Sequence, residues 1–125
     1  MERNIENQSK GFISPPKYKI LPSGINKAKL VSFLSSIGKF DQLIFILQFE
    51  ILEGEYRGYF VKGRVNQSSN GKFGKLWQLF RAMGVELDIF DQYDLKDLIA
   101  KECFINVETR SNGNAITEFI PLNSF

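Results

Sequence analysis

The chain has 125 residues, of which 43% are hydrophobic and twelve are phenylalanine, so it can bury the core of one domain and is too apolar to be disordered throughout. Its single cysteine, Cys103, excludes an internal disulfide, and the lack of histidine excludes Ser-His and Cys-His nucleophile pairs and argues strongly against a structural zinc site. The net charge of +2 is unevenly spread, because five acids and one lysine lie within residues 86–97, which leaves the rest of the chain basic.

Residues 1–20 are expected to form a flexible tail, and residues 21–125 the domain. The tail is polar, lacks periodicity and contains Ser14-Pro15-Pro16, which favours an extended backbone. It has no apolar core of the kind found in signal peptides. The longest apolar run, Leu43–Leu47, is far shorter than the about 20 residues that cross a bilayer. These features predict a protein without membrane contact and located in the cytoplasm, which is the host cytoplasm if the protein is viral.

Apolar residues at alternate positions predict three strands in the first half of the chain, at about 25–35, 43–51 and 56–65. In the first, the alternation slips after Leu30, which predicts a β-bulge near Ser32. The second is the most regular, with Ile44 and Ile46 expected on the face opposite the core. Its core face consists of Leu43, Phe45, Leu47, Phe49 and Ile51.

The second half of the chain predicts one helix and two further strands. The helix is expected at about 72–83, followed by Gly84 just past its end. A short helical turn within 91–99 should point Leu95, Leu98 and Ile99 inward. The strands, at about 102–108 and 115–120, are joined by a turn at Asn112-Gly113. The helix stripe assigned to the core is Phe73, Leu76, Trp77, Phe80 and Met83.

Three strands, a helix and two more strands are the order of a mainly β fold of the OB type. That fold is a five-stranded Greek-key barrel with one α-helix between strands 3 and 4. Closing the sheet into a barrel also covers the strand edges. An SH3-like barrel is the second choice, because such barrels lack an inserted helix of this length.

Three segments resemble small proteins of phage replication modules. They are Leu21-Pro22-Ser23-Gly24 before a Lys/Ala-alternating strand, the run LIFILQFEILEGEYRGYF (43–60) and the helix FGKLWQLFRAMG (73–84). The resemblance spans about 21–120 and is to OB-fold single-stranded-DNA-binding proteins, so it implies that fold and that ligand. Bacterial-type members end in an acidic tail that recruits partners, whereas this chain ends in Pro121-Leu122-Asn123-Ser124-Phe125, so recruitment by that route is not expected.

The first candidate binding surface is the outward face of the first three strands. A single-strand binder needs cations along the phosphates and an aromatic ring for stacking, which contributes roughly 1–3 kcal/mol per base. The alternative without a binding role is that the tail or a dimer interface covers Phe60, Ile44 and Ile46, and that the cations are ordinary surface charges. The candidates are Lys27, Lys29, Phe60, Lys62 and Arg64, flanked by Ile44, Ile46 and Gln48.

Three loops add further candidates. Lys39 and Phe40 follow the first strand and Arg110 precedes the last hairpin turn, where OB-type loops close over a ligand. Phe40 could equally plug the core. Tyr56 and Arg57, near the tip of the second hairpin, suit stacking on a base or a peptide, or solubility alone.

No cofactor, metal or catalytic site is predicted. The acidic segment 86–97 lacks the spacing of a calcium loop, and no phosphate-cradling glycine motif is present. Cys103 alternates with core residues and is expected to be an inert buried thiol. The leading hypothesis is therefore sequence-independent binding of single-stranded DNA, favoured over RNA, in replication or recombination. Assembly into a homo-oligomer and contacts with replication proteins remain open, and the alternative is a protein-interaction module that uses the apolar outer face.

Overall fold

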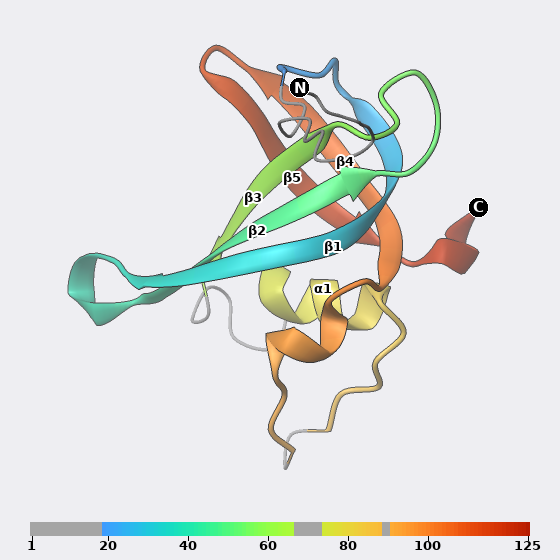
Figure 1. Ribbon diagram of the computed structural model, residues 1–125. Coiled ribbons are helices and arrows are strands. Elements are labelled where there is room, and N and C mark those ends of the chain that lie inside the picture. The colour runs from blue at the N-terminus through green and yellow to red at the C-terminus, as the bar shows by residue number, and fades with distance from the viewer. Residues whose placement is uncertain (1–18, 67–73, 89–90) are drawn as a thin grey trace, which may run out of the picture.

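The computed structural model describes residues 19–66, 74–88 and 91–125, with the side chain of Phe40 left out. The described part is mainly β, with one helix between the third and fourth strands (Figure 1), as predicted. Short 3₁₀ turns lie at Lys39–Asp41, Leu95–Leu98 and Leu122–Ser124. The elements are β1 (Gly24–Ile37), β2 (Leu43–Ile51), β3 (Phe60–Asn66), α1 (Lys75–Ala82), β4 (Glu102–Arg110) and β5 (Gly113–Ile120).

The five strands form one antiparallel sheet in the order β3-β2-β1-β4-β5. β1 changes register against β2 between Leu30 and Ser32, which confirms the predicted bulge. Before the bulge β1 lies between β2 and β4. Beyond it, β1 continues only with β2, and the two strands project from the body as an arm (Figure 1).

The two end strands of this order, β3 and β5, approach each other across the curved sheet. A Cβ atom added to Gly63 in β3 would lie 2.8 Å from Cδ1 of Ile116 in β5, so the Ile116 side chain covers the glycine backbone. No hydrogen-bonded ladder joins β3 to β5 among the described residues. α1 contacts both strands near this junction.

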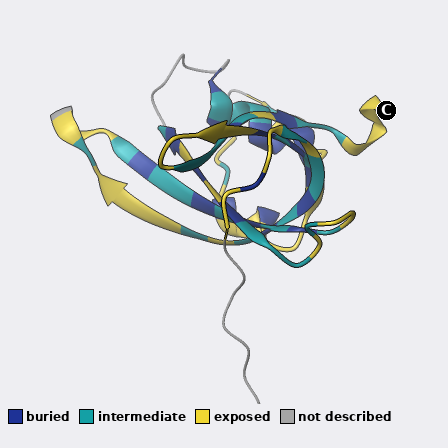
Figure 2. Cartoon of the chain, turned by 90° about the horizontal axis from the view of Figure 1, so that it is seen from above, coloured by how far each residue is buried: buried dark blue, intermediate teal, exposed yellow. Residues whose placement is uncertain are grey.

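The core lies within the curve of the sheet and against α1 (Figure 2). It confirms the alternation expected in β4, because Cys103 and Ile105 are fully buried. In β2 it confirms Leu47, Phe49 and Ile51, whereas Leu43 and Phe45, which were also expected in the core, are only partly buried. The predicted helix stripe is confirmed for three of its residues, while Trp77 is half-buried and Phe73 lies outside the described residues. The three confirmed stripe residues are Leu76, Phe80 and Met83.

Two expectations about single side chains need correction. Ile44 lies on the face opposite the core, as expected, but it is only 5% exposed because the turn at Gly38 folds back over it, so it is not available on that surface. Ile99 was expected to point inward, but it follows the 3₁₀ turn Leu95–Leu98 and is 38% exposed. In contrast, Leu79, which the helix stripe omitted, is fully buried. None of the described helices is both long and apolar enough to cross a membrane.

Candidate functional site

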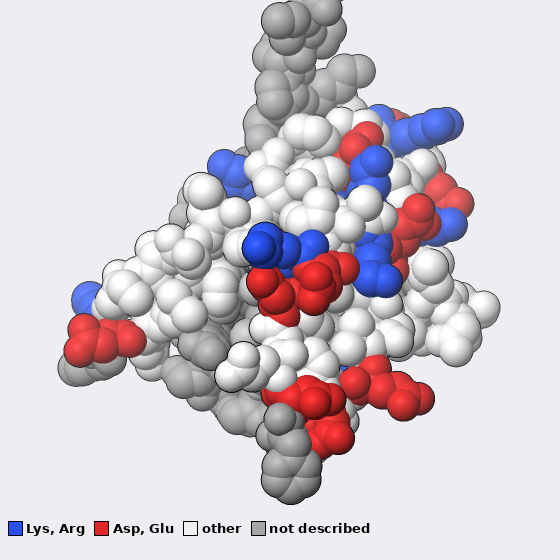
Figure 3. All heavy atoms as spheres, turned by 60° about the horizontal axis from the view of Figure 1, so that its bottom comes forward, with Lys and Arg blue, Asp and Glu red and all other residues white. Residues whose placement is uncertain are grey.

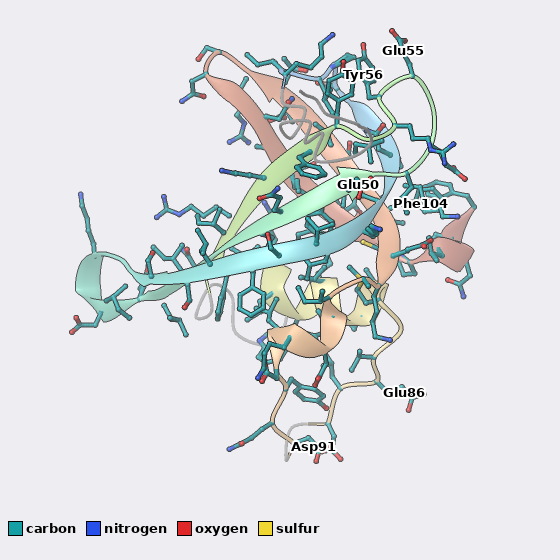
Figure 4. The ribbon with its side chains drawn as sticks, viewed as in Figure 1. Glu50, Glu55, Tyr56, Glu86, Asp91 and Phe104 are labelled. Atoms are coloured by element: carbon teal, nitrogen blue, oxygen red, sulfur yellow. The ribbon has the colours of Figure 1, made fainter. Side chains whose placement is uncertain are left out.

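The outward face of β1 carries cations that are already paired with carboxylates. Lys27 Nζ lies 3.7 Å from Oε2 of Glu53 and 3.7 Å from Oε1 of Glu102. Lys29 Nζ lies 3.7 Å from Oε1 of Glu50, which projects from the middle of the sheet (Figure 4). Half-exposed pairs of this length are individually weak. They nevertheless mix both charges on this part of the face, so it offers a polyanion little net attraction.

The outward face becomes basic toward β3. Lys62 lies opposite Gln48, and Arg64 lies opposite Ile46, in the register of β2 with β3. Both cations are exposed, whereas Gly63 between them and Val61 and Val65 on either side of them are buried. The alternation therefore holds the two charged side chains on one side of β3, at the end of the sheet order.

A groove runs between this end of the sheet and the hairpin that joins β4 to β5. It has a volume of about 580 Å³ and is bounded on one side by β3 and on the other by β5 and its turn. Four cations and three asparagines line it, and no carboxylate does so among the described residues. We call it the basic groove. Its polar lining consists of Lys62, Arg64, Asn66, Lys75, Arg110, Asn112 and Asn114.

A second hollow of about 310 Å³ shares Lys62 and Asn114 with the basic groove and extends it toward the start of β3. Phe60 lines this extension, as does Lys19. The Phe60 ring is half-buried, so part of the ring remains accessible. The two hollows together bring an aromatic ring beside a row of cations along β3.

Lys19 also meets two aromatic rings of the loop before β3. Its Nζ lies 5.3 Å from the centroid of Tyr56 and 5.8 Å from that of Tyr59, within the range of cation–π attraction. The two rings pack edge to face, with centroids 5.9 Å apart. Tyr56 is therefore half-buried beside Lys19, at the top of the molecule in Figure 4.

Hydrogen bonds to the backbone hold the walls of the basic groove together. Lys75 Nζ donates to the carbonyl oxygen of Ile116 at 2.8 Å, and Gln78 Oε1 accepts from the Phe119 N–H at 3.0 Å, so α1 is fastened to β5. Asn114 Nδ2 donates to the Leu21 carbonyl at 2.8 Å, and Asn114 Oδ1 accepts from the Leu21 N–H at 2.8 Å. These bonds fix the positions from which the cations project.

The cations differ in how they are held. Arg110 Nε lies 2.7 Å from Glu108 Oε1, which orients the guanidinium but also places a carboxylate behind it. Arg64 makes no side-chain ion pair or hydrogen bond within the part of the chain that the structure describes. Arg64 is therefore the cation of the groove that is best able to take up an incoming anion.

The structure brings four of the ten predicted site residues together. Phe60, Lys62, Arg64 and Arg110 line the basic groove or its extension. Lys27 and Lys29 lie in the ion-paired part of the sheet face. Lys39 and Phe40 lie in the 3₁₀ turn at the tip of the arm, and Tyr56 and Arg57 lie in the turn between β2 and β3.

Sequence reasoning did not identify Lys19, Lys75 or Asn66 as groove residues. It placed the loop 109–114 at the binding cleft but singled out only Arg110 in it, and not Asn112 or Asn114. Lys19 had been placed in the tail, and Lys75 lies on a helix whose only signal was its apolar stripe. Asn66, Asn112 and Asn114 lie at a strand end and in a turn, where asparagine is common for backbone reasons alone. Only the positions of distant strands bring these residues to one groove.

The acidic segment lies on a separate lobe. Glu86 and Asp91 project from the chain below α1 in Figure 4, and Figure 3 shows acidic side chains gathered on that face. All five acids of the segment are exposed. No cluster of three or more potential metal-ligating side chains occurs within residues 19–66, 74–88 and 91–125. The described molecule thus has a basic side at the groove and an acidic lobe beneath the helix.

No protein-family model matches this sequence, and no curated protein is significantly similar to it.

Proposed function

We propose that the domain is an OB-type Greek-key barrel that binds single-stranded DNA in the basic groove, without sequence specificity, in replication or recombination. The fold part of this proposal is supported by the strand order β3-β2-β1-β4-β5, by the helix between β3 and β4, and by the approach of β3 to β5. These features agree with the five-stranded, partly open Greek-key barrel of the OB type.

The observation that carries the ligand assignment is the composition of the basic groove. A cleft lined by Lys62, Arg64, Lys75 and Arg110, with asparagines and no described carboxylate, attracts a polyanion and supplies hydrogen-bond donors to phosphate oxygens. Lysine and arginine contacts to phosphates also release condensed counterions, which favours binding at low salt.

Phe60 favours a single strand over a duplex. Its ring lies in the extension of the groove, beside Lys62. In a duplex the faces of the bases are stacked on one another, whereas an unpaired base can stack on an aromatic side chain. The preference for DNA over RNA is part of the proposal and rests on the resemblance to phage single-strand binders.

A binding role rather than a catalytic one fits the same groove. Its lining contains no described acid that could act as a general base, and the only thiol of the chain, Cys103, is buried in the core. Acid–base cleavage needs a positioned proton donor and acceptor, whereas the lining of this groove suits the positioning of a polyanion by its cations.

Fluorescence anisotropy with labelled poly-dT, poly-rU and duplex DNA at two salt concentrations tests the proposal. We expect the tightest binding to poly-dT, weaker binding to the duplex, and an affinity that falls steeply as salt rises. The double substitution of Lys62 and Arg64 by alanine should reduce the slope of log K against log salt by about 2, or about 1 per cation.

The matched control replaces Lys27 and Lys29 by alanine, which removes the same charge from the ion-paired part of the face. We expect a smaller loss of affinity than for the groove variant. Negligible binding of the wild-type protein to all three ligands at low salt would refute the proposed function. Equal losses for the two double variants would refute the assignment to the groove.

A further inference from the structure

In the arm, the second half of β1 has one edge without a partner strand among the described residues. β4 pairs with β1 only as far as Lys29, and the last backbone bonds on that side join Leu30 to Ala100 and Lys101. Within the described residues, nothing pairs with Val31–Ile37 on this side. This stretch projects from the body with β2 alone and is largely exposed (Figures 1 and 2).

The direction of the edge's backbone groups follows from β2. Ile51 donates to the Tyr59 carbonyl at 2.9 Å and accepts from the Gly58 N–H at 2.8 Å, so its backbone groups face the β3 side. Because these directions alternate along an antiparallel strand, even-numbered residues of β2 face β1. Their register partners Ser32, Leu34 and Ser36 thus bond to β2. Phe33, Ser35 and Ile37 direct their N–H and C=O groups to the open edge.

The edge lacks the features that normally prevent strands from pairing between molecules. Residues 31–37 contain no charged residue and no proline, in a chain that is 24% charged. Exposed edges usually carry lysine, proline or a covering loop. β3, at one end of the sheet order, follows that rule with Lys62 and Arg64. The arm instead exposes Leu34 and Ile37, at 72% and 66%.

From these observations we infer that residues 33–37 of this edge pair with the same segment of a second copy, giving a dimer whose sheet continues across a two-fold axis at Ser35. Because the edge carries no charge, electrostatic attraction gives it no preference for a charged partner over a second copy of itself. In this register Phe33 lies opposite Ile37 of the other copy, and the outward backbone groups of both residues meet in register. Phe33 already packs edge to face on Phe45, with centroids 6.3 Å apart, so the incoming Ile37 extends an existing apolar cluster.

The axis lies at Ser35 because β4 and the residues just before it occupy the edge of β1 up to Leu30. With the axis one residue earlier, Ile37 of the second copy would lie opposite Val31, next to the residues that bond to Leu30. With the axis at Ser35, the second copy's strand ends opposite Phe33 and turns away. The paired edge is short, about 17 Å for five residues. It buries less than the about 1,200 Å² of a typical stable interface, so the dimer should dissociate on dilution.

The first test is sedimentation velocity of the full chain over a range of concentrations, without nucleic acid. We expect a monomer at low concentration and a dimer at high concentration. Ser35→Lys places two like charges at the axis and should keep the protein monomeric. Gln42→Lys, an equally exposed position at the tip of the arm, is the matched control and should dimerise like the wild type. Circular dichroism of both variants verifies that they are folded.

The second test traps the dimer. Residues directly opposite each other in a bonded antiparallel pair have Cα atoms about 5.5 Å apart, which suits a disulfide. Ser35→Cys should therefore cross-link under mild oxidation, while Ser32→Cys, whose copy would lie about 20 Å away, should not. Cys103 is buried and does not interfere. A monomer at every concentration, or equal cross-linking at the two positions, would overturn the inference. Neither test involves DNA, so the result is independent of the proposed ligand.

Discussion

Asn114 holds both backbone groups of Leu21, although the two residues are 93 positions apart in the chain. The Leu21 N–H donates to Asn114 Oδ1 and Asn114 Nδ2 donates to the Leu21 carbonyl, each at 2.8 Å. Leu21 itself is only 1% exposed. The carboxamide bonds to both backbone groups of Leu21, as a neighbouring strand would, and so connects the chain before β1 to the start of β5. It thereby fixes one wall of the basic groove.

Replacing Asn114 by alanine should lower the free energy of unfolding by about 1–3 kcal/mol, because two hydrogen bonds to a buried segment are lost. Urea unfolding followed by circular dichroism measures the change. Asn112→Ala removes the same side chain from an exposed position in the same turn and should change stability by less than about 0.5 kcal/mol. If the two variants were equally stable, the bonds to Leu21 would not contribute as described.

Gly63→Ala should destabilise the protein by about 1–3 kcal/mol, because the added Cβ would lie 2.8 Å from Cδ1 and 3.3 Å from Cβ of Ile116. The second distance matters most, since a Cβ atom cannot rotate away. Thermal and urea unfolding measure the loss.

A double variant separates this overlap from the conformational effect of losing a glycine. Ile116→Ala opens the space opposite Gly63, so the double variant Gly63→Ala/Ile116→Ala should be more stable than the sum of the two single effects predicts. Strict additivity would show that β3 and β5 are not in contact at this point. The measurement thus probes the approach on which the proposed barrel depends.

Much of the fold could be predicted from local patterns. The strict alternation of β2 and β4, the bulge after Leu30 and the glycine after the helix each reflect interactions between residues close in sequence. Gly84, with a φ of 87°, has the left-handed backbone expected just past a helix end. β3 begins at Phe60 rather than Tyr56, because Tyr56–Tyr59 form a tight turn in which the Tyr59 N–H donates to the Tyr56 carbonyl.

What local patterns missed depends on contacts between distant segments. Alternation correctly placed Ile44 on the side opposite the core, but it could not show that the turn at Gly38 covers that side chain. Lys75 and Arg110 are single cations with no periodic signal. They meet Arg64 only because α1 and the last hairpin lie beside β3. The part of the candidate site on β3 was therefore predicted from the sequence, whereas the prediction for the rest of the groove was incomplete.

Phe60→Ala should weaken binding of poly-dT by an amount equivalent to about 1–3 kcal/mol, the usual contribution of one stacked base. Its effect should persist at high salt, since stacking releases no counterions. Anisotropy titrations at two salt concentrations distinguish this from the loss of a cation. Phe104→Ala is the matched control, because that ring projects from β4 and packs on Phe125, with centroids 5.1 Å apart (Figure 4). Equal affinity of the Phe60 variant and the wild type would exclude a stacking role.

The Cys103 thiol should be unreactive in the folded protein at pH 8. Burial raises its pKa to about 12, while a backbone hydrogen bond with Ile120 acts in the opposite direction. The reactive form of cysteine is the thiolate, which is scarce far below the pKa. Labelling with a thiol reagent should therefore be slow in buffer and complete after denaturation. Rapid labelling in buffer would show that the core around β4 opens readily.

The same raised pKa predicts how stability depends on alkaline pH. The unfolded thiol loses its proton near its ordinary pKa of 9.0, whereas the folded one keeps it to about 12. Between these values the unfolded state binds fewer protons, so the free energy of unfolding falls as pH rises, and below about 9 this group has no effect. The comparison is with Cys103→Ala, which removes this thiol and leaves every other ionisable group in place. Urea unfolding from pH 8 to 11 should show a steeper decline for the wild type than for that variant. Parallel declines would mean that the thiol ionises as easily in the folded protein as in the unfolded chain.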